Sequence, residues 1–385
     1  MPLVRDYAAS SRSAPRRLDA AAVPLPACLL SIELHGFRNH RQTRLQPGAA
    51  PFVLLTGPNG AGKTNVLEAV SLLAVGRGLR GNPLSQMAAA GGAGGFSITA
   101  ELLPDPGLPA ITLLTATRAD APDRRLLRIN GAAAPLSALS DWSSQLWLTP
   151  AMDRLFADTA SARRRFLDRL VLALSPGHAG HATRYDAAMR ARTRLLTADQ
   201  PADPAWLTAL ELQMAEHGAA LAEARAAAVA ALDRQLAGAP DGPFPKPALA
   251  LSDADQGDLP GRLRAARGAD RAAGRATQGP HRQDLLVTHA DKAMPAALAS
   301  TGEQKALLIS ILLGHAALVA DRTGRLPLLL LDEAAAHLDP DRRRALFARL
   351  AELGGQAWMT GTDAQLFEGL EAVRYSVAQG AILSG

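Results

Sequence analysis

The segment GPNGAGKT, Gly57 to Thr64, constrains the fold of this 385-residue chain more than any other feature. It matches the phosphate-binding pattern G-x-x-x-x-G-K-[ST] at every fixed position. The apolar run Phe52 to Thr56 before it predicts a buried strand, and residues 63–73 after it predict a helix. A strand, a glycine-rich turn and a helix in this order are typical of an α/β fold.

The residue types in this loop suit a polyphosphate. Glycines let backbone N–H groups turn inward around an anion, and the helix N-terminus adds its partial positive charge. Lys63 would reach the β- and γ-phosphates of a nucleotide, and the Thr64 hydroxyl would ligate Mg²⁺. An accidental glycine-rich turn is the alternative, but the chain has only four lysines, and one of them is Lys63. The expected nucleotide-binding residues are Gly57, Pro58, Asn59, Gly60, Ala61, Gly62, Lys63, Thr64 and Asn65.

A second motif, LLLLDE, spans Leu328 to Glu333. Four leucines predict a buried strand that carries Asp332 to its carboxyl end, where ligands bind in nucleotide-binding sheets. Asp332 would then hold the metal together with Thr64, and Glu333 would activate the attacking water as a general base. Alone the pattern is weak, because a strand can also end in a solvated acidic turn. Its pairing with the phosphate-binding loop favours the functional interpretation.

A third motif, STGEQK, begins at Ser300 and precedes an apolar helix expected over residues 301–319. Ser300 and Glu303 have the spacing of a capping box, so a well-capped helix is one interpretation. The other is a second anion-binding helix N-terminus. It follows Thr64 by 236 residues (300 minus 64), so it cannot belong to the same loop. The residues concerned are Ser300, Thr301, Gly302, Glu303, Gln304 and Lys305.

Composition excludes several classes of protein. With 48% hydrophobic and 20% charged residues, the chain is expected to be an ordinary globular protein. A single cysteine excludes a disulfide framework, and the nine histidines show no i, i+4 pair for a transition metal. No unbroken apolar run approaches the length of a membrane span, and residues 1–27 lack the apolar core of a secretory signal. We therefore expect a cytoplasmic protein without a membrane partner, preceded by a disordered extension over residues 1–27.

The remaining pattern divides the chain into an α/β part interrupted by helices. Residues 98–103, 111–117 and 126–129 predict an antiparallel meander, with a turn at Asn130-Gly131. From Pro150 the composition favours helices, among them one over residues 204–236, and residues 239–261 are expected to be a loop. Strands at 328–331 and 356–360 with a helix between them predict a parallel pair. The expected division is 1–27, 28–149, 150–275 and 276–385.

At its three motifs the chain resembles the ATP-binding-cassette ATPases, and more closely it resembles the RecF family of bacterial recombination and gap-repair proteins. In the cassette ATPases the signature motif, which STGEQ resembles, closes over the γ-phosphate held by the partner subunit. AHLDP, which ends at Pro340, resembles the D-loop and includes Asp339. The RecF-like segments are FRNH, GPNGAGKTN, LTPAMDRLF, RRRFLDRLV, GPHRQD, STGEQKALL and LLLLDEAAAHLD, in that order from Phe37 to Asp339.

This resemblance implies an ABC-type P-loop ATPase head, a mixed sheet with an antiparallel meander and a parallel core, split by a mostly helical second lobe. It implies slow, DNA-stimulated hydrolysis of ATP with Mg²⁺, an ATP-dependent homodimer, and binding to single- or double-stranded DNA at gaps or junctions. It also implies work with RecO and RecR in replication and recombinational repair.

Two departures from the general cassette pattern concern the γ-phosphate sensor. No glutamine follows the strand expected at 146–149, and Thr362 takes the place of the usual switch histidine. The RecF family is similar in the second departure, which supports the resemblance and favours slow hydrolysis.

The candidates for DNA contact come from two segments. Arg163, Arg164 and Arg165 would neutralise phosphates or form the solvated face of a helix, and both interpretations stay open. His281 and Arg282 of GPHRQD form a basic pair near nucleotide or DNA, or part of a solvated loop.

Three other kinds of protein are alternatives to this function. A transporter nucleotide-binding subunit needs a Q-loop glutamine, a switch histidine and a shorter gap between the loop and the signature. An SMC-like repair ATPase needs hundreds of heptad residues between its halves. A phosphoryl-transfer kinase does not need STGEQ or a D-loop.

Overall fold

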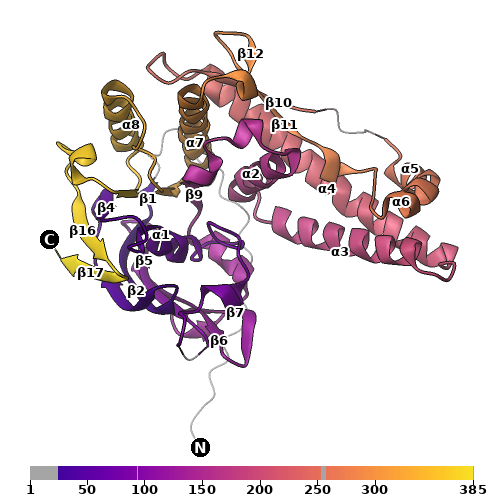
Figure 1. Cartoon of the computed structure of the whole chain (residues 1–385), viewed down its shortest axis with the longest axis horizontal. Coiled ribbons are helices and arrows are strands. Elements are labelled where there is room, and N and C mark those ends of the chain that lie inside the picture. The colour runs from indigo at the N-terminus through magenta and orange to yellow at the C-terminus, as the bar shows by residue number, and fades with distance from the viewer. Residues whose placement is uncertain (1–24, 93, 253–256, 385) are drawn as a thin grey trace, which may run out of the picture.

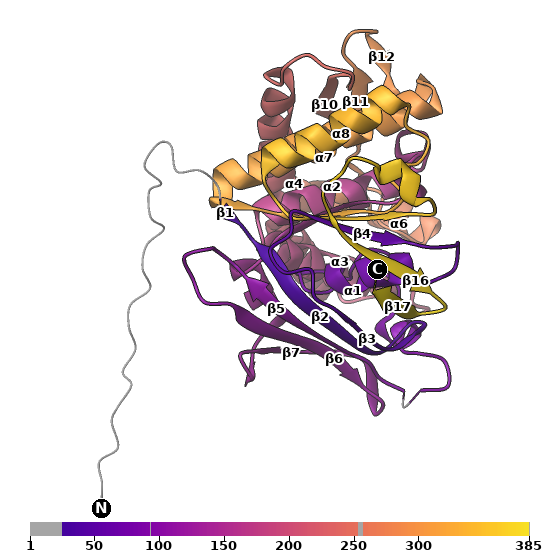
Figure 2. The same cartoon turned by 90° about the vertical axis from the view of Figure 1, so that its left-hand side faces the viewer.

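Two six-stranded sheets form the head of the molecule (Figures 1 and 2). The computed structural model describes residues 25–92, 94–252 and 257–384. One sheet is entirely antiparallel, with the order β3-β2-β5-β6-β7-β8. Its strands are β2 (Cys28–Phe37), β3 (His40–Leu45), β5 (Ser97–Leu103), β6 (Ile111–Arg118), β7 (Ala121–Ile129) and β8 (Ala132–Ala133).

The other sheet has a parallel core and the order β17-β16-β4-β15-β14-β9, with only β17 antiparallel to its neighbour. It unites distant parts of the chain, because β4 from the first third lies between two strands from the last thirty residues. Its strands are β4 (Phe52–Thr56), β9 (Gln145–Leu148), β14 (Leu328–Leu331), β15 (Ala357–Gly361), β16 (Val373–Ala378) and β17 (Ala381–Ser384).

This central sheet is buried on both faces, which explains the unbroken apolar runs of its strands. Val53 and Leu55 pack with α1 (Lys63–Ser71) and the antiparallel sheet. Leu54 points to the opposite face, where it joins the core formed with α2 (Ala160–Leu174), α7 (Thr301–Thr323) and α8 (Pro340–Leu353). Figure 2 shows α7 and α8 on the far side of the central sheet from the antiparallel sheet.

A helical lobe extends to one side of the head (Figure 1). Arg192 of α3 (His178–Thr197) is fully buried there. It donates to Glu211 of α4 (Pro204–Ala237) at 3.0 Å and to Asp270 of α6 (Arg267–Ala273) at 2.5 Å. Buried charges persist only when paired, so this cluster fixes the three helices relative to one another. The elements of the lobe are α2 (Ala160–Leu174), α3 (His178–Thr197), α4 (Pro204–Ala237), β10 (Pro247–Leu251), α5 (Leu259–Ala265), α6 (Arg267–Ala273), β11 (Leu285–His289) and β12 (Met294–Pro295).

The structure confirms the predicted fold class, including the meander, the parallel core and the helical lobe. Sequence reasoning missed α3, and it was wrong for residues 247–251, which form a strand paired with β11 inside the expected loop. Residues 1–24 of the expected extension lie outside the described residues. Leu25–Pro26 forms β1, which pairs in parallel with β13 (Arg325–Leu326), so the described structure starts before residue 28.

Among the described helices, α7 alone has the length and hydropathy that a membrane span requires. Core helices pass the same test, and 61% of its most apolar window is buried inside the protein. Ala306, Leu307 and Ile311 are fully buried between the sheet and the helical lobe. These contacts identify α7 as a core helix.

Gln356, just before β15, joins the two sheets through one buried amide. Its Oε1 accepts hydrogen bonds from the Leu29 N–H at 2.9 Å and from Trp358 Nε1 at 3.0 Å. Its Nε2 donates to the carbonyls of Gly48 and Ala50. The amide is 1% exposed, so water cannot replace these partners.

We predict that Gln356→Leu lowers the free energy of unfolding by about 2–5 kcal/mol, because it leaves two buried N–H donors unpaired. Urea unfolding followed by circular dichroism measures the change. Gln365→Leu, at an exposed glutamine of the same C-terminal region, is the matched control. An unchanged urea midpoint for Gln356→Leu would contradict the proposed role of the amide.

Candidate nucleotide site

The phosphate-binding loop requires glycine at two positions, where different neighbours leave no room for a side chain. Gly57 has φ +148°, and a Cβ there would lie 2.2 Å from the carbonyl oxygen of Val377. Gly62 has φ +114°, and its Cβ would lie 2.7–2.8 Å from side-chain atoms of Asn39 and His40. Any larger residue would therefore force the loop away from its supports.

The FRNH segment holds the loop from the side of the antiparallel sheet. Asn39 Nδ2 donates to the carbonyl of Ala61 at 3.1 Å, and His40 Nε2 lies 3.1 Å from the carbonyl oxygen of Gly62. Burial lowers the pKa of His40. The sequence associated this segment with the family only, whereas the structure shows that it fixes the loop backbone.

Arg38 and Arg80 anchor the helix that follows the loop. Both donate to Glu68 of α1, whose carboxylate is completely buried, at 2.7–2.8 Å. Two arginines on one buried carboxylate compensate for its desolvation. The start of α1, and with it Thr64, is thereby held in place.

Lys63 lies inside the loop and is 4% exposed. Its Nζ donates to the carbonyls of Gly57 at 2.7 Å and Pro58 at 3.0 Å. Burial lowers its pKa, while the nearby carboxylates of Glu333 and Asp332 act in the opposite direction. The ammonium is thus held at the centre of the loop, where it can exchange carbonyl oxygens for phosphate oxygens.

The carboxylate of Asp332, at the end of β14, is the point where the motifs meet. It accepts from the Thr64 hydroxyl at 2.8 and 3.0 Å and from the Thr360 hydroxyl at 2.8 Å. Thr64 and Asp332 are 268 residues apart, and the order β4-β15-β14 brings their strand ends to one edge. The sequence predicted that Asp332 and Thr64 lie together, and the structure places them in direct contact.

Glu333 adopts a left-handed backbone conformation with φ +51°. Such a conformation costs a residue with a side chain about 1–2 kcal/mol. Its amide donates to the Thr360 hydroxyl at 2.9 Å, so one threonine contacts both acidic residues. Glu333 is thus a strained, half-buried residue directly after Asp332, the carboxylate that would hold the metal ion. A general base would need to lie at this place.

The donors at this point suit Mg²⁺. A threonine hydroxyl and a carboxylate are hard oxygen ligands, and Mg²⁺ commonly takes only one or two protein ligands together with substrate phosphates. No cluster of three or more His, Cys, Asp or Glu side chains that could form an all-protein metal cage occurs in the described parts of the chain. Thr64 and Asp332 are therefore the residues that would hold the ion.

The signature-like motif lies at the start of α7, where its first residues face solvent and its last two point inward. Ser300 and Glu303 form the predicted capping box. Lys292 also donates to Glu303, and these contacts lower the pKa of that carboxyl to about 2. Gln304 and Lys305 are buried, with the Gln304 amide donating to the carbonyl of Ala299 at 2.9 Å.

Two further predicted positions have local structural contacts. Asp339 is the N-cap of α8, accepting from the Arg342 N–H at 2.8 Å. Thr362, the predicted switch position, is exposed. The threonine that contacts the acidic pair is Thr360, two residues earlier.

The candidates for DNA contact differ in the partners that they already have within the protein. Arg163 forms an ion pair with Asp284 at 2.6 Å, so its charge is already balanced within the protein. His281 is held between the Tyr185 hydroxyl at 2.7 Å and the carbonyl of Ala276 at 3.0 Å, and burial lowers its pKa. Arg165 is exposed and donates to Ser161 on its own helix.

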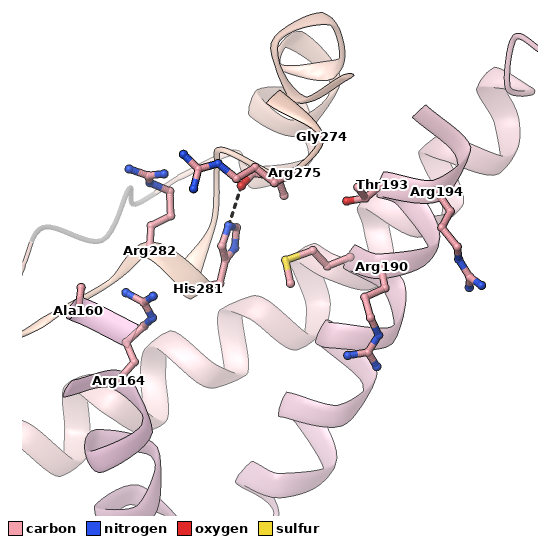
Figure 3. A pocket seen from close by; sticks show the side chains of 11 residues that line it. Ala160, Arg164, Arg190, Thr193, Arg194, Gly274, Arg275, His281 and Arg282 are labelled. Atoms are coloured by element: carbon pink, nitrogen blue, oxygen red, sulfur yellow. Dashed lines mark hydrogen bonds between the residues drawn. The ribbon is translucent and has the colours of Figure 1, made fainter. Parts of the chain in front are cut away.

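Arg164 and Arg282 instead line a cleft of about 690 Å³ in the helical lobe (Figure 3). Three arginines that sequence reasoning missed line it as well, and no aspartate or glutamate among the described residues does. Arg164 donates to the carbonyl of Gln283, whereas the other four have no carboxylate partner among the described residues. The cleft arginines are Arg164, Arg190, Arg194, Arg275 and Arg282.

The fold and the site together define a P-loop ATPase head of the class shared by RecF, RecN and SMC proteins. The family described as RecF/RecN/SMC N terminal domain matches residues 28–380. A solved RecF structure with ATP, from the RecFOR pathway, has a TM-score of 0.81 at 19% identity, covering 95% of this chain and 99% of that one. The Smc head domain of Pyrococcus furiosus has a TM-score of 0.53 at 15% identity, covering 92% of this chain and 95% of that one.

Sequence similarity then specifies the family within this class. The chain is 50% identical over 365 residues to the DNA replication and repair protein RecF of Mesorhizobium japonicum, covering 90% of this chain and 95% of that protein. It is 47% identical to RecF of Brucella suis, covering 91% and 94%. The chain therefore belongs to the RecF family, and this assignment excludes the transporter, SMC and kinase alternatives.

Proposed function

We propose that this protein is an ATP-dependent DNA-binding protein that acts in DNA replication and in recombinational repair of gaps. The observation that carries the proposal is the direct contact of the Thr64 hydroxyl with Asp332, beside Lys63 and Glu333. Its RecF relatives are DNA replication and repair proteins. ATP and Mg²⁺ are the cofactors, and RecO and RecR are the expected partners, since a solved structural neighbour belongs to the RecFOR pathway.

Hydrolysis follows from the roles of the four site residues. Lys63 and the loop amides would bind the β- and γ-phosphates, and Thr64 and Asp332 would hold a Mg²⁺ ion, which would neutralise charge developing on the phosphates. The Glu333 carboxylate takes a proton from water, whose oxygen attacks the γ-phosphorus while ADP leaves. Thr360 holds Asp332 and Glu333 at a fixed spacing. We infer slow, DNA-stimulated turnover, with ATP binding closing a homodimer and hydrolysis releasing it.

Two substitutions separate binding from hydrolysis. Glu333→Gln is expected to bind ATP normally but to hydrolyse it about 100-fold more slowly, the scale of losing a general base. Lys63→Ala is expected to lose ATP affinity, because it removes the charge that the loop holds against the phosphates. Fluorescence titration measures affinity, and release of radiolabelled phosphate measures hydrolysis. Wild-type affinity in Lys63→Ala would refute the nucleotide site.

The surface at the start of α7 supports the shared site of a dimer. The capping box pairs the amides of Ser300 and Glu303, whereas the amides of Thr301 and Gly302 have no partner among the described residues. Leu298, beside them, is 73% exposed, so this end of the helix is open to approach from outside. A phosphate held by a second copy would give the two amides an acceptor.

We predict that Ser300→Arg blocks ATP-dependent dimerisation, because a bulky cation would stand where the partner's nucleotide must approach. Light scattering with ATP and Mg²⁺, in a Glu333→Gln background that preserves the nucleotide, reports the mass. ATP binding to the monomer is expected to stay intact, and Ser137→Arg, at an exposed serine elsewhere in the head, is the control. A Ser300→Arg protein that still dimerises would contradict the shared site.

The arginine-lined cleft of the helical lobe is the DNA-facing surface that the structure favours. Its arginines come from α2, α3 and the segment 274–282, so three separate elements contribute to the lining (Figure 3). Within the described parts of the chain these arginines have no carboxylate partner and the lining holds no acidic residue, which suits a phosphodiester backbone. Met189 is the largest apolar side chain in the lining, so the cleft offers little anchorage for an apolar peptide.

Charge reversal tests this surface. The pair Arg190→Glu and Arg282→Glu is expected to weaken DNA binding and to lower the slope of log K against log salt by about 2, roughly one for each lost phosphate contact. Fluorescence anisotropy with duplex, single-stranded and gapped DNA gives the affinities. The pair Arg118→Glu and Arg128→Glu, exposed on the antiparallel sheet, changes net charge equally. Equal loss in both pairs would show that only net charge matters.

A further inference from the structure

Lys305 has a buried ammonium that joins three segments of the chain. The residue is 4% exposed and lies in the first turns of α7, directly after Gln304 of the signature-like motif. Its Nζ donates to the carbonyl of Ala336 at 2.8 Å and to that of Glu333 at 3.3 Å. The Oδ2 of Asp153, from the segment after β9, lies 3.6 Å from the same Nζ.

The turn that Lys305 contacts is strained. Glu333 and His337 both have left-handed backbone conformations, with φ +51° and +63°, although neither is glycine. Such conformations persist only where surrounding contacts enforce them. An ammonium that binds one carbonyl at the start of the turn and another three residues later supplies such a contact.

Asp153 strengthens the anchorage of the ammonium. Its second oxygen, Oδ1, is buried without a hydrogen-bond partner among the described residues. Burial raises the pKa of the Asp153 carboxyl, against the opposing effects of Lys305 and His337. In this buried position the ionised carboxylate is stabilised most by an adjacent cation. The pair thus connects the segment after β9, the start of α7 and the turn after β14.

The geometry calls for lysine in particular. A compact ammonium has three donors, which match two carbonyl oxygens and one carboxylate around a single point. A guanidinium spreads its donors over a planar fork and needs more room. This requirement gives a physical reason for one of the four lysines in an arginine-rich chain.

We propose that Lys305 is a positioning residue that couples the start of α7 to the Glu333 of its own chain. The proposal rests on the proposed function, in which the start of α7 receives the nucleotide of the partner subunit. Displacement of α7 then moves Nζ and, through the carbonyl of Glu333, the general base. Each protomer would thus align its own Glu333 when it engages the nucleotide held by the other.

Lys305→Met is the main test, because it keeps the length of the side chain and removes the ammonium. Without nucleotide, amide hydrogen exchange of residues 333–338 is expected to rise. ATP affinity is expected to stay unchanged, while single-turnover hydrolysis slows by about 10- to 100-fold, the scale that misplacing a catalytic group produces. Lys305→Arg should restore hydrolysis only partly. Asp153→Asn, a milder change, should shift both readouts in the same direction.

Lys292→Met is the matched control, since Lys292 also binds a residue at the start of α7, Glu303, but does not contact the turn. It should leave the exchange of residues 333–338 unchanged. A folded Lys305→Met protein with wild-type amide hydrogen exchange or wild-type hydrolysis would overturn the proposal. If Lys305→Met does not fold, the same two measurements on Asp153→Asn decide the question. Failure of the proposed function looks different: the wild-type protein would not bind ATP, and Lys63→Ala would change nothing.

Discussion

The carboxylate of Asp332 is the constraint on which the site depends. It accepts hydroxyl hydrogen bonds from Thr64 and Thr360, so it joins the helix after the phosphate-binding loop to the ends of two strands. These groups meet only because β15 lies between β4 and β14 in the central sheet. The binding of an ion by Thr64 and Asp332 would therefore depend on the relative position of three separate parts of the chain.

Electrostatic pairing supports both parts of the molecule in different ways. In the head, Glu68 is compensated by two arginines that hold the first helix, and in the lobe Arg192 is compensated by two carboxylates that hold three helices together. In both clusters the burial of charge is costly, but the pairing holds the surrounding elements in a defined geometry. The cleft arginines are the contrast, because their charges remain available for an external anion.

Much of the head could be predicted because its signals are local. A loop motif, leucine runs and a capping box specify their own structure, and the carboxyl-edge rule then placed Asp332 beside Thr64. Thr360 and Asp153 could not be identified, since their roles depend on strand order and on burial by distant segments. The helix α3 was missed for a related reason. From the sequence alone Arg192 is expected at the surface, and only the contacts with the distant Glu211 and Asp270 explain its burial.

The position of β4 has a consequence for how the chain folds. Both neighbours of this strand, β15 and β16, lie about 300 residues later, so its edges stay unpaired until nearly the whole chain has left the ribosome. Pairing over such a distance must close a large loop and is intrinsically slow. The loop that depends on β4 therefore takes its final shape late, and fragments that end before residue 357 lack both partners of that strand.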